Sequence, residues 1–362
     1  MDIAILVRNL YPPRGAEESM YYVKNKLEKE HNVRIFGFIM DKNNLVSLPA
    51  NSTAKKKPIF SSSPLPIKAF NDLVKRYRLA YYFKSELERY SPDLILAQHE
   101  LCLLAAWFGL TSDTQTIAFI RDEYQLSLPD YDEGALVNFF RYMKSAIDWR
   151  VNQKMFDSVD AVIANSNYMA DRYSERYSDL DPYVVYPFVD VEQYRVMDTG
   201  EKILHVTPEM HKGINITLDV AEKLPQEEFI IVGEQPKQRI AERITNLTNV
   251  EYIGYVDDMK TVYRDTKLVL MPSKWEEAFG RIPIEAGISG IPTLGSSAGG
   301  LPEAIGIDDL IVDSNSPSDY AYRIKEICEN YEYYSYEVAK NAEKKSADKQ
   351  YSNLENIISS LF

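Results

Sequence analysis

Residues 267–292 read KLVLMPSKWEEAFGRIPIEAGISGIP and contain two glutamates that a single regular helix would not bring together. Eight helical steps from Glu277 to Glu285 amount to roughly 80° around the helix axis. The apolar run that ends at Pro272 predicts a buried strand, and Pro283 suits the first turn of a helix, where its missing N–H costs nothing. We therefore predict a strand, a polar loop with Glu277, and a helix with Glu285 in its first turn. Both carboxylates would lie beyond the carboxyl end of the strand, where open α/β sheets bind ligands.

Short apolar runs alternate with amphipathic helical stretches along most of the chain. The strands expected in the first half are residues 3–7, 33–39, 94–97, 116–120, 161–164 and 183–185, and those in the second half are 203–206, 229–232, 250–253, 268–271 and 293–294. Strands of this kind separated by helices predict parallel sheets that are covered on both faces. The two series, and a length of 362 residues, predict an α/β protein with two doubly wound Rossmann-like domains.

The boundary between these domains is expected where acidic and turn residues interrupt the pattern, in residues 187–200. We predict an N-terminal domain over residues 1–190 and a C-terminal domain over residues 191–345. Residues 346–362 are predicted to form a C-terminal helix that packs back on the N-terminal domain.

Composition and charge exclude several classes of function. The chain is 45% hydrophobic and 26% charged, and its net charge of −13 argues against general nucleic-acid binding, which needs a basic surface. Two cysteines far apart in sequence, Cys102 and Cys328, form no disulfide framework and suit a reducing compartment. The N-terminal run reads as a strand rather than a signal peptide, and the apolar stretch 101–110 is too short to span a bilayer, which takes about 20 residues. We expect a cytoplasmic protein.

Two common nucleotide-binding signatures are missing from the sequence. A dinucleotide site needs G-x-G-x-x-G after the first strand, but residues 9–17 read NLYPPRGAE, with one glycine and two prolines. The chain also has no P-loop motif, no H-E-x-x-H and no cluster of metal-ligand residues. NAD chemistry and P-loop chemistry are therefore excluded, and no metal is expected.

An ordered set of motifs along residues 1–330 resembles the retaining GT-B glycosyltransferases of the GT4 family. Glu277 and Glu285, with Phe279 and Gly280 between them, resemble the E-x7-E motif of that family. The other matching segments are PRGAE at 13–17, DAVIANS at 160–166, KG at 212–213, VG at 232–233, YIGY at 252–255, GIP at 290–292 and GGLPE at 299–303. Each segment alone has an ordinary explanation as a turn, a solvated acid or a helix start, but their order favours the family.

This resemblance implies two domains that face each other across a cleft, with the nucleotide-sugar donor on the C-terminal domain and the acceptor on the N-terminal one. It implies that Glu285 binds the ribose, that Glu277 binds a hydroxyl of the donor sugar, and that Lys212 neutralises the pyrophosphate. Retention of configuration, no dedicated protein base and no bound metal are implied as well. Our donor-binding candidates are Gly15, Lys212, Gly233, Glu277, Ala278, Phe279, Gly280, Arg281 and Glu285, and our catalytic candidates are Glu277, Lys212 and Asp122.

Three departures from the family pattern concern charge and the acceptor side. Thr207 stands where the family usually carries an arginine, so Arg281, His211 or Arg14 would supply the second positive charge, with Arg281 preferred. Ala16 follows Gly15 where the family more often has two glycines. The alanine methyl group leaves less room for a ligand to approach the backbone, so we prefer Gly15 as the residue that contacts the donor. Arg121 and Asp122 stand where many members have a histidine. Asp122 is our candidate for an acceptor-facing group, and Arg14 and Arg121 complete the acceptor side.

Residues 55–90 form a basic stretch in this acidic chain, with nine Lys or Arg against three Asp or Glu. Apolar residues recur in it at helical spacing, which is typical of a helix on an anionic membrane surface. An amphipathic helix packed on the first sheet, with its cations in water, explains the pattern equally.

The sequence leaves rival functions open. The predicted enzyme moves a sugar from a UDP-, GDP- or ADP-linked donor to a glycan or lipid-linked acceptor in cell-envelope or glycoconjugate synthesis. The alternatives are a nucleotide-sugar epimerase or a phosphorylase on the same fold, and a catalytically silent GT-B partner subunit that binds a nucleotide sugar. The E-x7-E segment favours transfer, whereas Thr207 keeps the silent subunit open.

Overall fold

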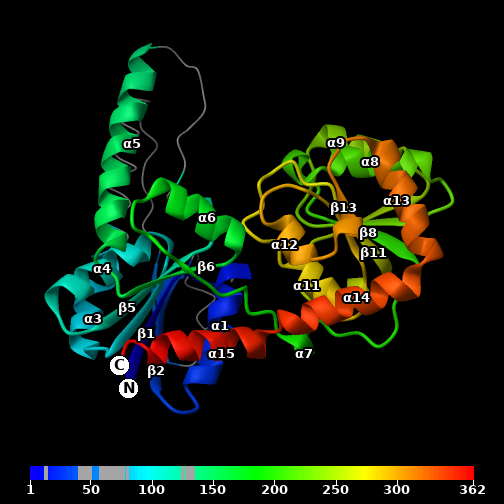
Figure 1. Cartoon of the computed structure of the whole chain (residues 1–362). Coiled ribbons are helices and arrows are strands. Elements are labelled where there is room, and N and C mark those ends of the chain that lie inside the picture. The colour runs from blue at the N-terminus through cyan, green and yellow to red at the C-terminus, as the bar shows by residue number, and fades with distance from the viewer. Residues whose placement is uncertain (12–14, 40–50, 57–77, 79–80, 124–125, 127–134) are drawn as a thin grey trace. The chain divides into compact units, whose positions relative to one another are not determined.

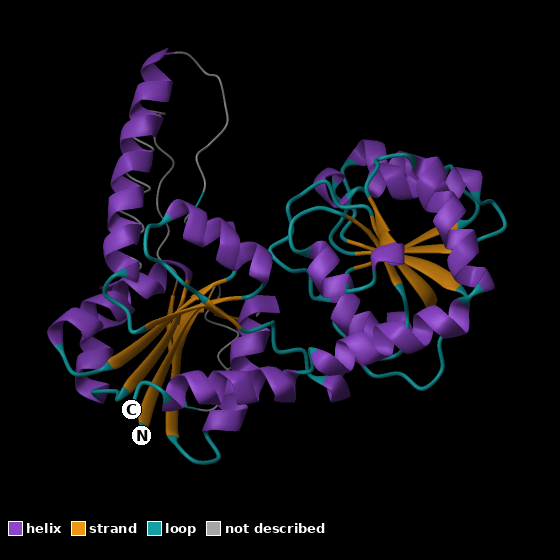
Figure 2. Cartoon of the chain, viewed as in Figure 1, coloured by secondary structure: helices purple, strands orange, loops and turns teal. Residues whose placement is uncertain are grey.

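The computed structural model describes residues 1–11, 15–39, 51–56, 78, 81–123, 126 and 135–362, which divide into two compact units (Figure 1). Unit 1 consists of Met1–Phe188 and Tyr351–Phe362, and unit 2 consists of Val189–Gln350. Each unit is built on one parallel sheet with helices against its faces (Figure 2). The prediction of an α/β protein with two doubly wound Rossmann-like domains is confirmed.

The sheet of unit 1 has seven strands in the order β3-β2-β1-β4-β5-β6-β7, all parallel. The strands are β1 (Asp2–Tyr11), β2 (Asn32–Ile39), β3 (Ser52–Lys56), β4 (Leu94–Gln98), β5 (Gln115–Ile120), β6 (Ala161–Ala164) and β7 (Tyr183–Val184). The helices are α1 (Gly15–Leu27), α3 (Lys84–Tyr90), α4 (Cys102–Thr111), α5 (Ala135–Phe156) and α6 (Asn167–Arg176), with short 3-10 turns η2 (Tyr81–Phe83) and η3 (His99–Leu101).

Unit 1 has its topological switch point between β1 and β4. From β1 the strand order runs to β2 and β3 on one side, and from β4 it runs to β5, β6 and β7 on the other. The central strands are apolar on both faces because helices cover both, and the residues of β4 are buried throughout. The loops that leave β1 and β4 at their carboxyl ends therefore border a crevice, which is the usual ligand position in such sheets.

The sheet of unit 2 has six parallel strands in the order β10-β9-β8-β11-β12-β13. The strands are β8 (Lys202–Val206), β9 (Phe229–Val232), β10 (Val250–Gly254), β11 (Thr266–Met271), β12 (Thr293–Ser296) and β13 (Ile311–Val312). The helices are α7 (Val191–Tyr194), α8 (Ile214–Lys223), α9 (Gln238–Thr245), α10 (Lys260–Tyr263), α11 (Ile282–Gly287), α12 (Leu301–Ile305), α13 (Pro317–Glu329) and α14 (Tyr331–Lys344), with 3-10 turns η5 (Met210–Lys212) and η6 (Asp308–Leu310). Here the switch point lies between β8 and β11.

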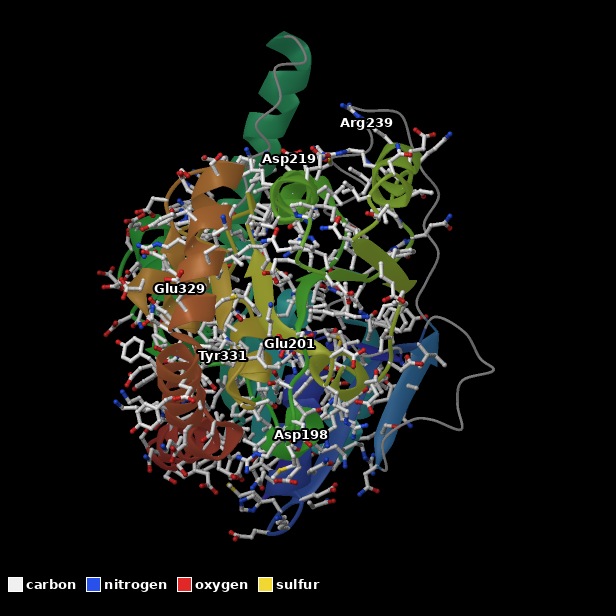
Figure 3. All side chains as sticks on the ribbon, turned by 90° about the vertical axis from the view of Figure 1, so that its right-hand side faces the viewer. Asp198, Glu201, Asp219, Arg239, Glu329 and Tyr331 are labelled. Carbon is white, nitrogen blue, oxygen red and sulfur yellow. The ribbon has the colours of Figure 1, made fainter. Side chains whose placement is uncertain are left out.

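Ion pairs join elements on the outside of unit 2. Arg243 of α9 pairs with Asp219 of α8, labelled in Figure 3, at 2.7 Å. At the amino ends of the strands Lys267 pairs with Glu227 at 2.6 Å and approaches Glu201 to 3.9 Å, and Figure 3 shows Glu201 and Tyr331 at this end. The amino edge thus has its own charge network, separate from the carboxyl edge where parallel sheets bind ligands.

The C-terminal helix α15 (Ala347–Ser359) continues from unit 2 into unit 1. Its residues from Tyr351 onward belong to unit 1, and the apolar side chains of Leu354, Ile357 and Ile358 are buried. The structure thus divides the chain after Phe188 and after Gln350, beside the predicted divisions after residues 190 and 345.

The apolar stretch 101–110 forms most of α4, whose residues are largely buried. Within the described part of the chain, no helix combines the length and the apolar character needed to cross a membrane. Of the basic stretch 55–90, residues 57–77 and 79–80 lie outside the described residues. Its last part forms η2 and α3, where Phe83 and Leu87 are buried.

Candidate functional site

The segment after β11 has the predicted order of strand, loop and helix. The strand ends at Met271, and α11 begins at Ile282 with Pro283 in its first turn. Glu277 in the loop is 8% exposed and Glu285 in the helix is 7% exposed, so both carboxylates are withdrawn from bulk water. Burying a carboxylate costs free energy unless it is paired or hydrogen-bonded, so the partners of each acid indicate its role.

Glu277 is held by a lysine from the other side of the switch point. The Lys212 Nζ lies 2.6 Å from the Glu277 Oε1, and the Ser273 hydroxyl donates to the same oxygen at 3.0 Å. Lys212 ends η5, which follows β8, whereas Ser273 and Glu277 follow β11. A carboxylate and an ammonium group therefore meet at the carboxyl edge of the sheet.

Gly213 allows these two loops to approach each other. Its φ is +81°, and a Cβ atom there would lie 1.9 Å from the carbonyl oxygen of Pro272. The carbonyl of His211 then accepts hydrogen bonds from the amides of Lys274, at 2.8 Å, and Trp275, at 3.1 Å. The KG pair is thus a structural requirement for placing Lys212 beside the glutamate loop, in addition to any contact with a ligand.

The GG pair of the GGLPE segment supports the backbone of Glu277. The amide of Gly300 donates to the carbonyl of Glu277 at 2.6 Å. A Cβ on Gly299 would lie 2.4 Å from the same carbonyl oxygen, so only glycine fits. This contact fixes the loop from the side of β12 and positions Glu277.

Glu285 has a different set of partners. The Tyr263 hydroxyl donates to its Oε2 at 3.2 Å, and the Arg281 Nε lies 3.2 Å from its Oε1. Burial and the neighbouring charge of Glu285 raise the pKa of Tyr263 well above its usual value, so the phenol remains a hydrogen-bond donor. Arg281 also donates to the hydroxyl of Tyr194 at 3.1 Å. Sequence reasoning missed Tyr263 and Tyr194, because only the tertiary fold brings them to Glu285 and Arg281. It also missed Ser273, which lies four residues before Glu277 in the same loop.

The three candidates for the missing positive charge have different positions. The Arg281 side chain is 14% exposed and pairs with Glu285, whereas His211 is about half exposed and lies 3.1 Å from Glu209. Arg14 lies outside the described residues. These placements leave the preference for Arg281 a prediction.

Thr207, at the position of the usual arginine, has a left-handed backbone with φ of +70°. For a β-branched residue this conformation is an outlier. The neighbouring His205 is buried, and burial lowers its pKa to about 4, so the ring is neutral near pH 7. Its Nδ1 lies 2.8 Å from the Thr217 hydroxyl and its Nε2 lies 3.1 Å from the carbonyl of Thr207. His205 therefore supports this strained turn and supplies no positive charge.

The other predicted donor residues that belong to unit 2 line the same edge of its sheet. Gly233 follows β9 with φ of +137°, and a Cβ there would lie 2.8 Å from Pro208. Gly280 has φ of +88°, which lets the chain turn into α11. Phe279 is buried and Ala278 is half-buried, so Phe279 anchors the loop in the core.

Two of the residues predicted for the acceptor side, Arg121 and Asp122, follow β5 at the carboxyl edge of unit 1. Gly15, which was predicted to contact the donor, begins α1 in the same unit. The Arg121 guanidinium lies 5.0 Å from the ring centre of Phe119 and is therefore packed against the sheet. The Tyr173 hydroxyl donates to the carbonyl of Asp122 at 2.9 Å and fixes the turn.

Sequence reasoning missed a polar group that follows β4. The guanidinium of Arg8, on β1, donates to both carboxylate oxygens of Glu100, at 2.9 and 2.6 Å to Oε2 and 3.2 Å to Oε1. Burial alone would raise the pKa of Glu100, but the charge of Arg8 outweighs burial and holds it below its usual value. The His99 Nδ1 lies 3.3 Å from the Asp122 Oδ2. The only sequence signal for this group was the pair HE directly after an apolar strand.

The part of the chain that the structure describes contains no candidate metal site, because no three His, Cys, Asp or Glu side chains gather there in a way that could hold a metal ion. The expectation of metal independence stays a prediction.

Two family models cover most of the chain. Residues 13–193 match the family described as Glycosyltransferase Family 4, and residues 201–330 match the one described as Glycosyl transferases group 1. The chain belongs to glycosyltransferase family 4. The first match covers the sheet of unit 1 from α1 onward, and the second covers the Lys212, Glu277 and Glu285 region. The predicted family is therefore confirmed, and the protein is a glycosyltransferase with the GT-B fold.

Individual relatives are more distant. A 42.6 kDa protein in the cps region of Klebsiella pneumoniae is 25% identical in an alignment of 330 positions that covers 83% of this chain and 86% of that protein. The D-inositol 3-phosphate glycosyltransferase of Mycolicibacterium smegmatis is 27% identical in an alignment of 205 positions that covers 48% of this chain and 46% of that enzyme. The match to this second relative thus spans about half the length of either chain.

Solved structures of the same fold cover the whole chain. HepE of Anabaena, in complex with UDP and glucose, has a TM-score of 0.74 at 18% identity and covers 99% of this chain and 100% of its own. The sucrose-phosphate synthase of Thermosynechococcus elongatus has a TM-score of 0.74 at 17% identity, with coverage of 100% and 99%. Because both sequence identities are below 25%, the structural similarity to these two proteins establishes the fold alone.

Proposed function

We propose that this family 4 glycosyltransferase transfers a sugar from a nucleotide-sugar donor to a glycan or lipid-linked acceptor in cell-envelope or glycoconjugate synthesis. Transfer proceeds with retention of the anomeric configuration and without a bound metal. The observation that carries the proposal is the partly buried contact of 2.6 Å between Lys212 and Glu277 at the switch point of unit 2, with Glu285 on the adjoining helix.

The chemistry needs a stabilised leaving group. As the bond between the anomeric carbon and the phosphate oxygen breaks, negative charge grows on the diphosphate, and Lys212 stabilises it. The acceptor oxygen forms the new bond on the same face of the sugar, and its proton passes to the departing phosphate oxygen. Glu277 holds a hydroxyl of the donor sugar, and Glu285 holds the ribose. Donor binding therefore replaces the Lys212–Glu277 contact with contacts to the ligand.

Arg281 enters the proposal as the second cation. Its present ion pair with Glu285 competes with that role. Ribose hydroxyls that bind Glu285 would take over the carboxylate, and the guanidinium would then face the diphosphate. Arg281→Ala is accordingly expected to weaken donor affinity, measured by calorimetric titration with UDP, and unchanged affinity would remove Arg281 from the site.

The donor itself is best identified with a panel. The structural likeness to HepE, whose structures hold UDP and UDP-glucose, makes UDP-glucose the first donor to test, followed by GDP- and ADP-sugars. A true donor raises the melting temperature in a concentration-dependent way and is slowly hydrolysed to free nucleotide. Stabilisation without any turnover would support a silent partner subunit, and no stabilisation by any donor would contradict the proposal.

Neighbouring residues on the same loop provide matched controls. Lys212→Ala and Glu277→Gln are expected to lower nucleotide release by about 100-fold or more, as the loss of an electrostatic contact to a leaving group does. Lys274→Ala and Glu276→Gln remove equivalent groups from exposed positions of the loop and should leave release within about threefold. Equal losses in both pairs would contradict the assigned roles.

Two simple measurements test retention and metal independence. Proton NMR of the first product formed from an α-linked donor should show an α-linkage, and a β-linkage would exclude retention. Turnover should persist in excess EDTA, and a loss that Mg²⁺ or Mn²⁺ restores would refute metal independence.

The basic stretch 55–90 adds a peripheral membrane contact to the proposal. Its excess of cations supports attraction to anionic lipid, worth about 1 kcal/mol per Lys or Arg near the surface. Sedimentation with anionic vesicles should exceed sedimentation with neutral vesicles, and equal partitioning would exclude the contact.

A further inference from the structure

A polar pocket of about 440 Å³ lies at the amino end of the sheet of unit 1, the end that N marks in Figure 1. The strands β1, β2 and β3 start there and contribute Asp2, Asn32, Arg34 and Thr53 to its lining, and α3 contributes further residues. Small-molecule pockets usually enclose about 300–1,000 Å³, so this one can hold a small ligand. The residues that line it all belong to unit 1, and the length of the strands separates it from the carboxyl edge.

The two acids of the pocket have partners other than its arginines. The Asp2 Oδ1 accepts a hydrogen bond from the Asn32 side chain. Glu86 of α3 forms an ion pair of 2.6 Å with Lys55 of β3. Burial alone would raise the pKa of Glu86, but hydrogen bonds from Lys55 and Ser85 outweigh burial and hold it below its usual value. Each carboxylate oxygen has two lone pairs, so both acids can accept further hydrogen bonds from a ligand.

The two arginines of the pocket pair with no acid in the part of the chain that the structure describes. The Arg34 guanidinium lies 4.7 Å from the ring centre of Tyr90, whose hydroxyl donates to the carbonyl of Asn32 at 2.7 Å. The Arg89 Nε donates to the carbonyl of Ser85 at 3.3 Å. These contacts leave most N–H donors of both guanidiniums available, and arginine binds phosphate through pairs of such donors.

A ligand with a phosphate at one end and hydroxyl groups at the other satisfies both halves of this lining. The phosphate compensates the charge of Arg34 and Arg89, and the hydroxyls donate to Asp2 and Glu86. A phosphate without hydroxyls would bring its negative charge to the two acids with no hydrogen bond between them, and an uncharged sugar would leave the arginines without a counter-charge.

We propose that this pocket is a binding site for a sugar phosphate or polyol phosphate, with Arg34 and Arg89 on the phosphate. The site goes beyond the proposed transfer, because it lies at the opposite end of the strands from the carboxyl edge and uses no residue of unit 2. The same chemical group occurs in a free metabolite and in the headgroup of a lipid such as phosphatidylglycerol, so the experiments test both sources.

Calorimetric titration tests the class of ligand. The probes are glucose 6-phosphate, glucose 1-phosphate and glycerol 3-phosphate, and we expect the best of them to bind about 10-fold more tightly than inorganic phosphate or glucose. Arg34→Gln and Arg89→Gln should each weaken its binding by about 10-fold or more, as the loss of a charge-assisted contact does. Arg150→Gln is the matched control, because Arg150 is an exposed arginine of α5 in the same unit, and its affinity should equal that of the wild type.

A donor-site variant separates this pocket from the edge of unit 2, where Lys212 would also attract a phosphate. Lys212→Ala should bind the best probe with wild-type affinity. Hydrogen exchange should slow in residues 84–90 when the probe binds and stay unchanged in residues 202–213. Loss of binding in Lys212→Ala, or wild-type affinity in both Arg34→Gln and Arg89→Gln, would overturn the proposal.

Sedimentation with phosphatidylglycerol vesicles tests the lipid source. Arg34→Gln and Arg150→Gln have the same net charge, so a headgroup ligand predicts about 10-fold weaker sedimentation of Arg34→Gln alone. A free metabolite predicts equal sedimentation of the two variants, together with arginine-dependent binding of the soluble probe. Absence of arginine-dependent binding in both arms would overturn the proposal. None of these experiments measures turnover, so failure of the proposed function is distinguishable from failure of this site.

Discussion

Single residues with positive φ determine the shape of the donor edge in unit 2. Gly213, Gly233, Gly280 and Gly299 follow or flank the strands that border the switch point. Thr207 adopts such a conformation with a branched side chain, supported by the neutral ring of His205. Glycine adopts these conformations without strain, so the strained residue among those named here is Thr207, and it lies in a loop to which we assign the nucleotide sugar.

Gly213→Ala is expected to destabilise unit 2 by about 2 kcal/mol or more and to weaken donor binding. The backbone strain of an alanine at positive φ and the collision of its Cβ with the Pro272 carbonyl both contribute to this cost. Gly254→Ala is the control, since Gly254 has nearly the same φ, +82°, but a Cβ atom there would meet no atom of the described residues within 4 Å. Urea denaturation of both variants separates the two costs. Equal destabilisation would show that the close approach to Pro272 contributes nothing.

Because His205 is buried with a lowered pKa, we expect the folded protein to lose stability in acid. Its folded pKa of about 4 lies below the ordinary 6.5, so between these values the unfolded chain binds a proton that the folded chain does not. Stability therefore falls as the pH decreases through this window, by about 3 kcal/mol in total, since one pKa unit corresponds to about 1.4 kcal/mol. His205→Gln should lose less stability than the wild type between pH 7 and pH 4.5 in urea titrations. Parallel losses in the two proteins would refute this assignment.

At the scale of elements, α11 and α10 form the pocket of Glu285. Helix α11 supplies the acid, and α10 supplies the Tyr263 hydroxyl. α11 also packs on α14, where Gly287 allows close contact, since a Cβ there would lie 3.1 Å from the carbonyl of Val338. The position of Glu285 therefore depends on helices that lie before and after it in the sequence.

Tyr263→Phe should destabilise unit 2 by about 1 kcal/mol and lower donor affinity, because it leaves a buried carboxylate with one donor fewer. Tyr320→Phe is the matched control: Tyr320 is equally buried, and its hydroxyl has no hydrogen-bond partner among the described residues. Its removal should be neutral or stabilising. Thermal unfolding and UDP titration of both variants test this difference, which would be refuted by identical effects.

At the scale of the whole molecule, the chain passes between the units twice, after Phe188 and after Gln350. Unit 1 is therefore discontinuous and includes the last twelve residues, Tyr351–Phe362. The buried side chains of α15 make the end of the chain part of the core of unit 1.

Leu354→Ala, in α15, should destabilise unit 1 by about 2–5 kcal/mol, the usual cost of truncating a fully buried leucine. Native-state hydrogen exchange should then show faster exchange in β1 and β4 and unchanged exchange in β8 and β11. Leu310→Ala, a buried leucine of unit 2, should produce the opposite pattern. Faster exchange in unit 2 for Leu354→Ala would contradict the division of the chain.

Much of the fold could be predicted because parallel strands buried on both faces are nearly continuous apolar runs. β3 was missed because its sequence, STAKK, is polar and lies at the edge of the sheet. The loop and helix that carry Glu277 and Glu285 were predicted correctly from one proline and the end of a strand. The contact of Lys212 with Glu277 was not predicted, because it joins residues 65 positions apart.

The sequence by itself determined the two-domain α/β class, the family and the order of strand, loop and helix around the two glutamates, because these depend on local pattern and short motifs. Only the tertiary structure decided which residues meet. It placed Lys212 on Glu277 and His99 beside Asp122. The physical reason is strand order: β8 borders β11 and β4 borders β5, and this pairing depends on how the sheets pack rather than on any single segment.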